Sequence, residues 1–223
     1  MKKNLIYFLL FATTLIGCQS NPDSETESSN VSGAAAINPP INGTYTIVAV
    51  YPHNTSSFTQ GLIWHNNTLY EGTGLTSQSK LLKTDIATGK ALQTLSIADS
   101  LFGEGIAVYN NKIYQLTWQN HKVFVYDANT FKKEKEFNWN YEGWGITLYN
   151  NQLIISTGTS NLYFVNPTTL AIEKTLGVYD NNGYIASLNE LEMIEGKIYA
   201  NVWGENKIIA INPGTGQVEK QFD

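Results

Sequence analysis

The sequence predicts an all-β protein of the β-propeller type. One phrase recurs four times, beginning at Gln60, Glu104, Trp144 and Asn189, which sets a repeat period of about forty residues. Each copy consists of short apolar runs separated by Asn-Asn or Glu-Gly turns. No stretch shows the 3.6-residue period of an amphipathic helix. A period near forty with four strands per repeat is typical of propeller blades.

Composition supports this class and excludes some partners. The chain has 223 residues, 42% of them hydrophobic and 15% charged, with a formal net charge of −5. That length is enough for one globular domain with its own core. The 13 Tyr, 9 Phe and 5 Trp favour strands over helices. Mild acidity and the lack of a Lys/Arg cluster after Lys3 argue against a nucleic-acid partner.

Residues 1–17 are predicted to be a lipoprotein signal peptide. Lys2 and Lys3 precede an apolar run that is too short to span a bilayer. The following Leu-Ile-Gly-Cys resembles a bacterial lipobox, which implies cleavage before Cys18 and lipid attachment to its sulfur. The alternative is an ordinary secretory signal with a chance cysteine. We expect an exported protein of the bacterial cell envelope, anchored through Cys18. As the only cysteine, Cys18 can form no disulfide within the chain.

Residues 18–43 are predicted to be a disordered tether, because they are mostly Ser, Asn, Glu, Pro and Ala with almost no large apolar side chain. The propeller domain is predicted over residues 44–223, with a first strand at residues 44–51. The expected strands of the first two repeats are 62–65, 68–71, 80–85, 91–96, 106–109, 112–116, 122–127 and 133–138. Outer hairpin turns are expected at residues 85–90 and 212–217, where glycine supplies a positive φ.

The opening residue of each repeat differs in chemistry. Gln60 and Asn189 are amides, Glu104 is a carboxylic acid and Trp144 carries an indole. Fourteen residues after each opening residue stand Gly74, Trp118, Gly158 and Trp203. A repeat needs the same apolar residues in every copy to pack, so different polar groups and indoles at equivalent positions are expected to converge on one site. Trp64 and Trp139 lie off these positions and are expected to pack between blades.

Six motifs along the chain resemble those of the glutamine cyclotransferases, the plant-type and bacterial glutaminyl-peptide cyclotransferases. They are Phe58-Thr59-Gln60-Gly61-Leu62, Leu101-Phe102-Gly103-Glu104-Gly105, Gln115-Leu116-Thr117-Trp118, Glu142-Gly143-Trp144-Gly145, Leu188-Asn189-Glu190-Leu191-Glu192 and Asn201-Val202-Trp203. The resemblance implies a five-bladed propeller. The chain would then hold about four blades plus one N-terminal strand, with the C-terminal blade and its family lysine missing. We therefore expect a truncated copy of a longer protein, weakly active or inactive.

The resemblance also implies an activity: N-terminal glutamine of peptides and proteins would be converted to pyroglutamate with release of ammonia. This acyltransferase reaction would run by a metal-independent acid/base mechanism without a cofactor. The implied catalytic residue is Glu104. The implied substrate-binding residues are Phe58, Gln60, Phe102, Trp118, Trp144, Asn189 and Trp203.

The chemistry of these residues fits the reaction. Glu104 is the only carboxylic acid among the opening residues, so we expect it to shuttle the proton from the attacking amine to the departing nitrogen. Packing against Phe102 and indoles should raise its pKa towards neutrality. Side-chain amides and indole N–H groups are expected to orient the substrate and to donate to the oxyanion. Glu190 and Glu192 are expected to be paired structurally.

Other functions have less support. The three histidines lack the spacing of metal ligands, so no metal site is expected. No G-x-S-x-G elbow or glycine-rich phosphate loop is present. The main alternative is a non-catalytic, lipid-anchored propeller that binds a peptide or a glycan. We expect a monomer.

Overall fold

The computed structural model describes residues 37–223. The predicted signal peptide, Cys18 and most of the predicted tether lie outside the described residues. Every regular element within residues 37–223 is a β-strand. Accordingly, this part of the chain has no helix long and apolar enough to cross a membrane.

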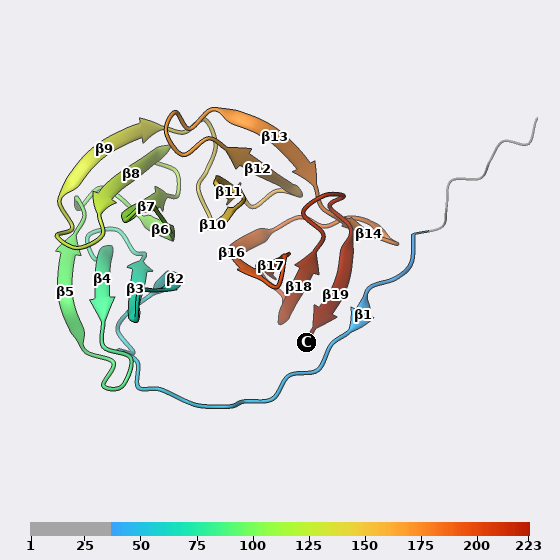
Figure 1. Ribbon diagram of the computed structural model, residues 1–223, viewed down its shortest axis with the longest axis horizontal. Helices are drawn as coiled ribbons and strands as arrows, with labels where there is room; N and C mark the ends of the chain where they lie inside the picture. The colour runs from blue at the N-terminus through green and yellow to red at the C-terminus, as the bar shows by residue number, and fades with distance from the viewer. Residues whose placement is uncertain (1–36) are drawn as a thin grey trace, which may run out of the picture. The chain divides into compact units, whose positions relative to one another are not determined.

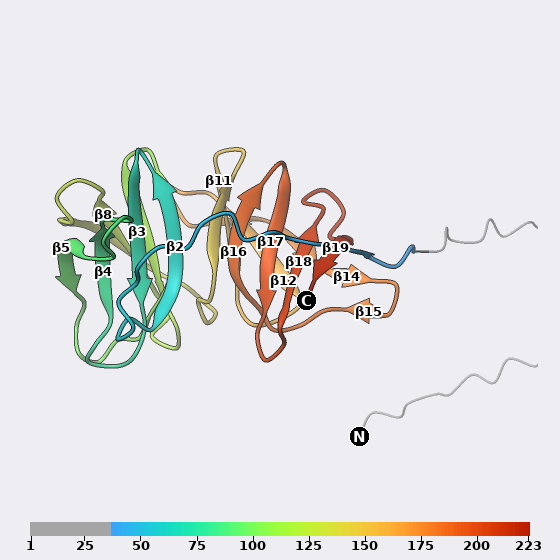
Figure 2. The same ribbon diagram turned by 90° about the horizontal axis from the view of Figure 1, so that it is seen from below.

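Four blades, each built of four consecutive antiparallel strands, follow one another along the chain and stand around a common centre, as Figures 1 and 2 show, and the short strand β1 (Ile41–Asn42) extends the sheet of the fourth blade to five strands. The first blade contains β2 (Thr59–His65), β3 (Thr68–Thr73), β4 (Lys80–Thr84) and β5 (Ala91–Ser96). The second contains β6 (Gly103–Tyr109), β7 (Lys112–Thr117), β8 (Lys122–Asp127) and β9 (Lys133–Asn138). The strands predicted for these two repeats are present, with their ends shifted by a few residues. The predicted propeller class is confirmed.

The last two blades follow the same order. The third blade contains β10 (Ile146–Tyr149), β11 (Gln152–Ser156), β12 (Asn161–Val165) and β13 (Ile172–Gly177). The fourth contains β16 (Leu188–Ile194), β17 (Lys197–Val202), β18 (Lys207–Ile211) and β19 (Val218–Phe222). A small hairpin of β14 (Tyr179–Asp180) and β15 (Gly183–Tyr184) lies between these two blades in the sequence.

Turn chemistry fixes the hairpins. The Asn-Asn pairs at 66–67, 110–111 and 150–151 and the Glu-Gly pair at 195–196 all have positive φ at both residues. Two consecutive positive φ angles are what a tight two-residue hairpin requires, and Asn and Gly tolerate them best. In the predicted outer turns Gly89 has a φ of 67° and Gly216 a φ of 82°. Glycine supplies the positive φ there, as expected.

Glycine also sets how closely the innermost strands pack. β2 lies beside β6, β6 beside β10, and β10 beside β16. A Cβ added to Gly61 would lie 2.6 Å from the backbone nitrogen of Ile106, and one added to Gly145 would lie 2.2 Å from the carbonyl oxygen of Asn189. The opening residues of the first three repeats are therefore each followed by glycine because the neighbouring backbone occupies the Cβ position.

The core lies mainly between adjacent blades. Fully enclosed Val, Ile and Leu side chains of neighbouring sheets form three clusters, one between each pair of consecutive blades. Phe164 is the largest fully buried side chain and packs in the cluster that joins the third and fourth blades. This apolar burial is the main force that holds the blades in place around the centre.

The N-terminal strand is not where the sequence predicts it. Residues 44–51 form no strand, and Tyr45, Val48 and Val50 are exposed. Instead β1 (Ile41–Asn42), inside the predicted tether, pairs in parallel with Lys220 and Gln221 of β19. The β-branched residues of 44–51 have no neighbouring strand to supply hydrogen bonds, so strand propensity alone does not produce a strand there.

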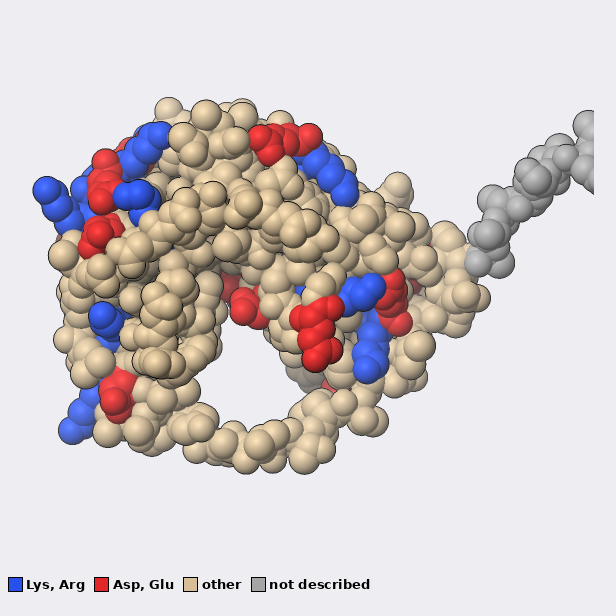
Figure 3. All heavy atoms as spheres, in the orientation of Figure 1, with Lys and Arg blue, Asp and Glu red and all other residues tan. Residues whose placement is uncertain are grey.

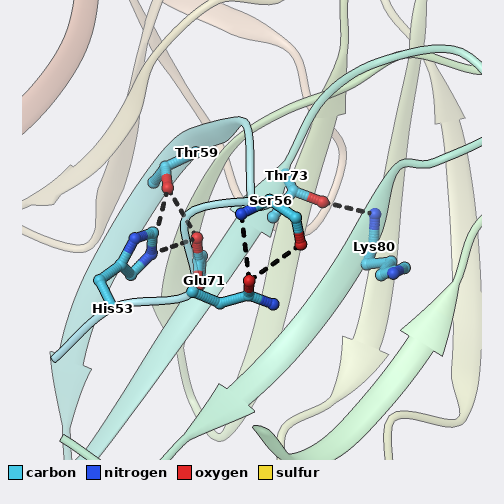
Figure 4. A network of polar contacts seen from close by, with 7 residues as sticks. His53, Ser56, Thr59, Glu71, Thr73 and Lys80 are labelled. Carbon is cyan, nitrogen blue, oxygen red and sulfur yellow. Dashed lines mark hydrogen bonds and ion pairs between the residues drawn. The ribbon is translucent and has the colours of Figure 1, made fainter. Parts of the chain in front are cut away.

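The segment from β1 to β2 crosses between the fourth and first blades (Figure 1). It is fixed to the first blade by His53, whose Nε2 lies 2.9 Å from Oε1 of the buried Glu71 (Figure 4). Thr59 donates its hydroxyl to the same oxygen over 2.6 Å. Between this segment and the blades lies the opening seen in Figure 3. Residues of β2 and β16, among them Gln60 and Asn189, line a cleft of about 460 Å³ between the first and fourth blades.

Candidate active site

The eight residues that the sequence places at the site surround one cavity of about 370 Å³. Its lining is Phe58, Gln60, Phe102, Glu104, Trp118, Trp144, Asn189 and Trp203. These residues come from all four blades, and the four opening residues lie on or next to the innermost strands β2, β6, β10 and β16. The repeat therefore brings chemically different side chains to one place, because equivalent positions of successive blades face the same centre.

Glu104 is the only carboxylic acid in the lining. It is the second residue of β6, its side chain is enclosed, and the residue is 6% exposed. No described residue donates a hydrogen bond to its carboxyl group. Burial, and after it the charge of Glu142, raises the pKa of Glu104 from 4.5 to about 9. The rise exceeds the expected shift towards neutrality, and it makes Glu104 a neutral acid at pH 7.

Aromatic rings form most of the wall. Phe102 packs edge-on against Phe58, with ring centroids 6.3 Å apart, and against Trp118 at 5.6 Å. On the other side Trp144 packs edge-on against Trp203 at 6.0 Å. Such edge-to-face pairs are favourable arrangements for aromatic rings. Trp203 is 65% exposed and so lies at the mouth of the cavity.

The two glycines at the later equivalent positions make room for this wall. A Cβ on Gly74 would lie 2.5 Å from the ring of Phe102, and one on Gly158 would lie 2.6 Å from the ring of Trp144. Tryptophan and glycine alternate at these positions and have complementary roles. Trp118 and Trp203 line the cavity, whereas Gly74 and Gly158 make room for the rings of Phe102 and Trp144.

The amides and one indole provide the free hydrogen-bonding groups. Within residues 37–223 no group forms a hydrogen bond with the side-chain amide of Gln60 or Asn189, although the backbone carbonyl of Asn189 accepts a hydrogen bond from the Ser156 hydroxyl over 2.7 Å. The indole N–H of Trp203 also has no described partner. These three groups can therefore bind a ligand without losing an internal hydrogen bond.

The other two indoles are expected from the sequence to offer their N–H groups to the substrate, but both N–H groups are already engaged. Trp118 and Trp144 both donate their Nε1–H to Oε2 of Glu142, over 2.8 and 2.9 Å. The sequence does not single out Glu142 as a site residue. Its only signal is its position in the Glu-Gly-Trp-Gly motif, two residues before Trp144.

The expected structural pairing is wrong for Glu190. Oε2 of Glu190 is buried without a hydrogen-bond partner and lies against Gly105, where an added Cβ would be 2.7 Å away. Burial, then the charges of Glu192 and Glu104, raises the pKa of Glu190 well above its ordinary value. The repeat contains the signal for this residue, since Glu190 occupies the position that is glycine in the other three copies.

The two remaining tryptophans have different environments. Trp139 is buried in the cluster between the second and third blades, as predicted. Trp64 is 53% exposed, so its predicted packing between blades is wrong. No three His, Cys, Asp or Glu side chains of the described region lie close enough together to hold a metal ion.

Comparisons with a family model, a curated relative and a solved structure all indicate the same family. Residues 10–223 match the model of the family described as glutamine cyclotransferase. A curated relative, the glutaminyl-peptide cyclotransferase of Arabidopsis thaliana, is 36% identical over 174 residues. That match covers 77% of this chain and 54% of the relative, so the chain spans about half the length of its curated relative.

Solved structures agree. The crystal structure of Myxococcus xanthus glutaminyl cyclase is 30% identical, with a TM-score of 0.78 over 82% of this chain and 78% of that one. Hydrazine synthase of Kuenenia stuttgartiensis is 14% identical, with a TM-score of 0.53 over 79% of this chain and 52% of that one, and shares the fold alone. The matched family model, the curated relative and the Myxococcus structure together show that this chain belongs to the glutamine cyclotransferase family.

Proposed function

We propose that the protein is a glutaminyl-peptide cyclotransferase that converts N-terminal glutamine to pyroglutamate and releases ammonia. The observation that carries the proposal is the cavity itself, where one enclosed carboxylic acid stands among free amides and an aromatic wall. Family membership supports the proposal, since the Arabidopsis relative is a glutaminyl-peptide cyclotransferase and the Myxococcus neighbour a glutaminyl cyclase.

Binding would fold the glutamine side chain back onto its own amine. The aromatic wall excludes water and encloses the methylene groups, and the amides of Gln60 and Asn189 orient the carboxamide. The substrate amine has an ordinary pKa of about 7.7–8.0, so a large share is neutral and nucleophilic near neutral pH. Because the reaction is intramolecular, holding this geometry supplies much of the rate.

Glu104 would move the proton. As the amine nitrogen attacks the carboxamide carbon, a carbon–nitrogen bond forms and the carbonyl oxygen gains negative charge. One oxygen of neutral Glu104 accepts a proton from the attacking nitrogen, and the other gives its own proton to the departing nitrogen, so the acid is regenerated when ammonia leaves. The N–H groups of Gln60, Asn189 and Trp203 are the free donors for the oxyanion.

The test is ammonia release from a dipeptide that begins with glutamine. A coupled assay measures the ammonia, and mass spectrometry detects the pyroglutamyl product. The same dipeptide with an acetylated amine is the matched control, because it keeps the side chain but lacks the nucleophile. Ammonia from the free dipeptide alone supports the proposal. Saturable binding of that dipeptide without ammonia release would instead identify a non-catalytic peptide-binding propeller.

We further propose that the protein is an exported monomer of the bacterial envelope, anchored by lipid on Cys18. The proposal rests on the signal-like residues 1–17 and the lipobox-like sequence that ends at Cys18. Cys18→Ala should move the protein from the washed membrane fraction to the soluble fraction. Retention of the variant on membranes would refute the anchor, and size-exclusion chromatography of the released protein checks the monomer.

A further inference from the structure

The loop between β9 and β10 places one carboxylate between the two halves of the aromatic wall. Oε2 of Glu142 accepts hydrogen bonds from the indole nitrogens of Trp118 at 2.8 Å and Trp144 at 2.9 Å. Oε1 accepts a third from the side-chain amide of Gln119 at 3.0 Å. With both oxygens engaged, the carboxylate has one orientation, and so do the two indoles that donate to it.

These two indoles belong to separate groups of rings. Trp118 continues the row of Phe58 and Phe102, whereas Trp144 packs with Trp203. Among the described interactions, the shared oxygen of Glu142 is the direct hydrogen-bonded link between these two groups. The width of the cavity between Trp118 and Trp144 therefore depends on Glu142.

The loop is built to deliver this carboxylate. The backbone N–H of Gly143 is shared between the carbonyl oxygens of Thr117 and Trp118, at 3.2 Å each. A Cβ on Gly143 would lie 2.8 Å from the Thr117 carbonyl oxygen, so only glycine allows this approach. Trp139 donates its indole N–H to the backbone carbonyl of Glu142 over 3.3 Å.

Glu142 also acts through its charge. Burial alone would raise its pKa, but the hydrogen bonds from Trp144, Gln119 and Trp118 outweigh burial and lower the pKa, with His121 adding to the effect. Glu142 is therefore ionised at neutral pH. The carboxyl groups that interact with Glu104 through their charge are those of Glu142 and Glu190, and the negative charge of Glu142 disfavours ionisation of Glu104.

We propose that Glu142 is a positioning residue of this site: its carboxylate holds the indoles of Trp118 and Trp144 as one wall, and its negative charge adds to the burial that keeps Glu104 in the proton-donating form. The second half of this statement rests on the proposed function. The first half concerns the geometry of the cavity and holds whatever the substrate is.

Two variants separate position from charge. Glu142→Gln keeps the length and an acceptor oxygen but removes the charge, whereas Glu142→Asp keeps the charge but is one methylene too short to reach both indoles. Glu173→Gln is the matched control, because Glu173 also accepts hydrogen bonds from two side-chain amides, those of Gln152 and Asn166, on an exposed strand away from the cavity. The readouts are the indole N–H resonances in NMR, the titration of Glu104 followed on carboxyl carbon, and the rate of ammonia release.

We expect both Glu142 variants to shift the indole resonances of Trp118 and Trp144 while that of Trp64 stays. Glu142→Gln should lower the pKa of Glu104 and move the alkaline limb of the kcat/KM profile to lower pH. Misplacing the wall should reduce kcat/KM by about 10- to 100-fold. In Glu142→Asp the pKa of Glu104 should stay closer to that of the wild type. Glu173→Gln should leave all three readouts unchanged.

Unchanged indole resonances and an unchanged Glu104 titration in Glu142→Gln would overturn the proposal. If a variant does not fold, the wild type still decides: acidification should shift the indole resonances of Trp118 and Trp144 together as Glu142 is protonated, below its ordinary pKa of 4.5. Absence of that shift would also overturn the proposal. A wild type that releases no ammonia would refute the proposed function, whereas the resonances and the titration would still test Glu142.

Discussion

Replacing Glu104 with glutamine should slow turnover strongly and stabilise the fold at neutral pH. The folded protein encloses this side chain at 6% exposure and raises its pKa from 4.5 to about 9, first through burial and then through the charge of Glu142. Between those two pH values the unfolded chain has an ionised Glu104 and the folded chain a neutral one. Glutamine has nearly the same shape and does not ionise, so it avoids this difference.

The size of the effect follows from the linkage of proton binding to folding. Because the folded pKa of this acid is raised, its contribution to stability is complete below pH 4.5 and is lost as pH rises towards 9. The difference in free energy of unfolding between Glu104→Gln and wild type should therefore be near zero at pH 4.5. Above that pH it should grow by about 1.4 kcal/mol per pH unit. At pH 7 the variant should be more stable by about 3 kcal/mol.

Urea unfolding followed by tryptophan fluorescence measures this difference by linear extrapolation at several pH values. Ammonia release measures the loss of turnover, expected to be about 10²- to 10⁴-fold. Glu173→Gln is the control, since hydrogen bonds from Gln152 and Asn166 lower the pKa of Glu173 and its removal should give no stabilisation. If Glu104→Gln and wild type differed in stability by the same amount at every pH, the conclusion that the folded protein keeps Glu104 protonated would be wrong. Activity of the variant within threefold of wild type would remove Glu104 from the mechanism.

Three further outcomes are expected. The kcat/KM profile should rise as the substrate amine loses its proton at about 7.7–8.0 and fall as Glu104 ionises at about 9; a flat alkaline limb would contradict its role as a proton donor. EDTA should leave the rate unchanged, because the described residues hold no cluster of metal ligands; loss of activity restored by zinc would contradict this. Gly158→Ala should destabilise the fold by more than about 1 kcal/mol and raise KM, because its Cβ would meet the ring of Trp144 at 2.6 Å. Gly196→Ala has a similar positive φ without neighbours within 4 Å, so it should lose stability but keep KM.

Much of the fold is predictable from local chemistry. The Asn-Asn pairs mark the first hairpin of three blades because Asn accepts the two positive φ angles of a tight turn. The eight strands of the first two repeats lie where the short apolar runs between turns place them. The set of lining residues is also accessible, since equivalent positions of a repeat meet at its centre. Gln60 and Glu104 can be placed together without any knowledge of distances.

Other features depend on contacts between distant segments. Residues 44–51 have the composition of a strand, but pairing depends on a neighbour, and the short β1 at Ile41–Asn42 pairs with β19 in their place. Glu142 is placed by a loop, and its partners Trp118 and Trp144 come from different blades, so neither spacing nor propensity reveals it. Glu190 could have been found, because a glutamate at a position that is otherwise glycine breaks the repeat.

Each blade forms from strands that are close in sequence, whereas the cavity needs all four blades, and this difference has a consequence for the kinetics of folding. Each blade closes through consecutive hairpins of residues near one another in sequence, and such local pairings form early in folding. The cavity has no such local origin: its lining runs from Phe58 to Trp203, and no blade supplies it alone. During refolding, the circular dichroism of the strands therefore reports on the separate blades, whereas recovery of catalysis reports on their docking around the centre.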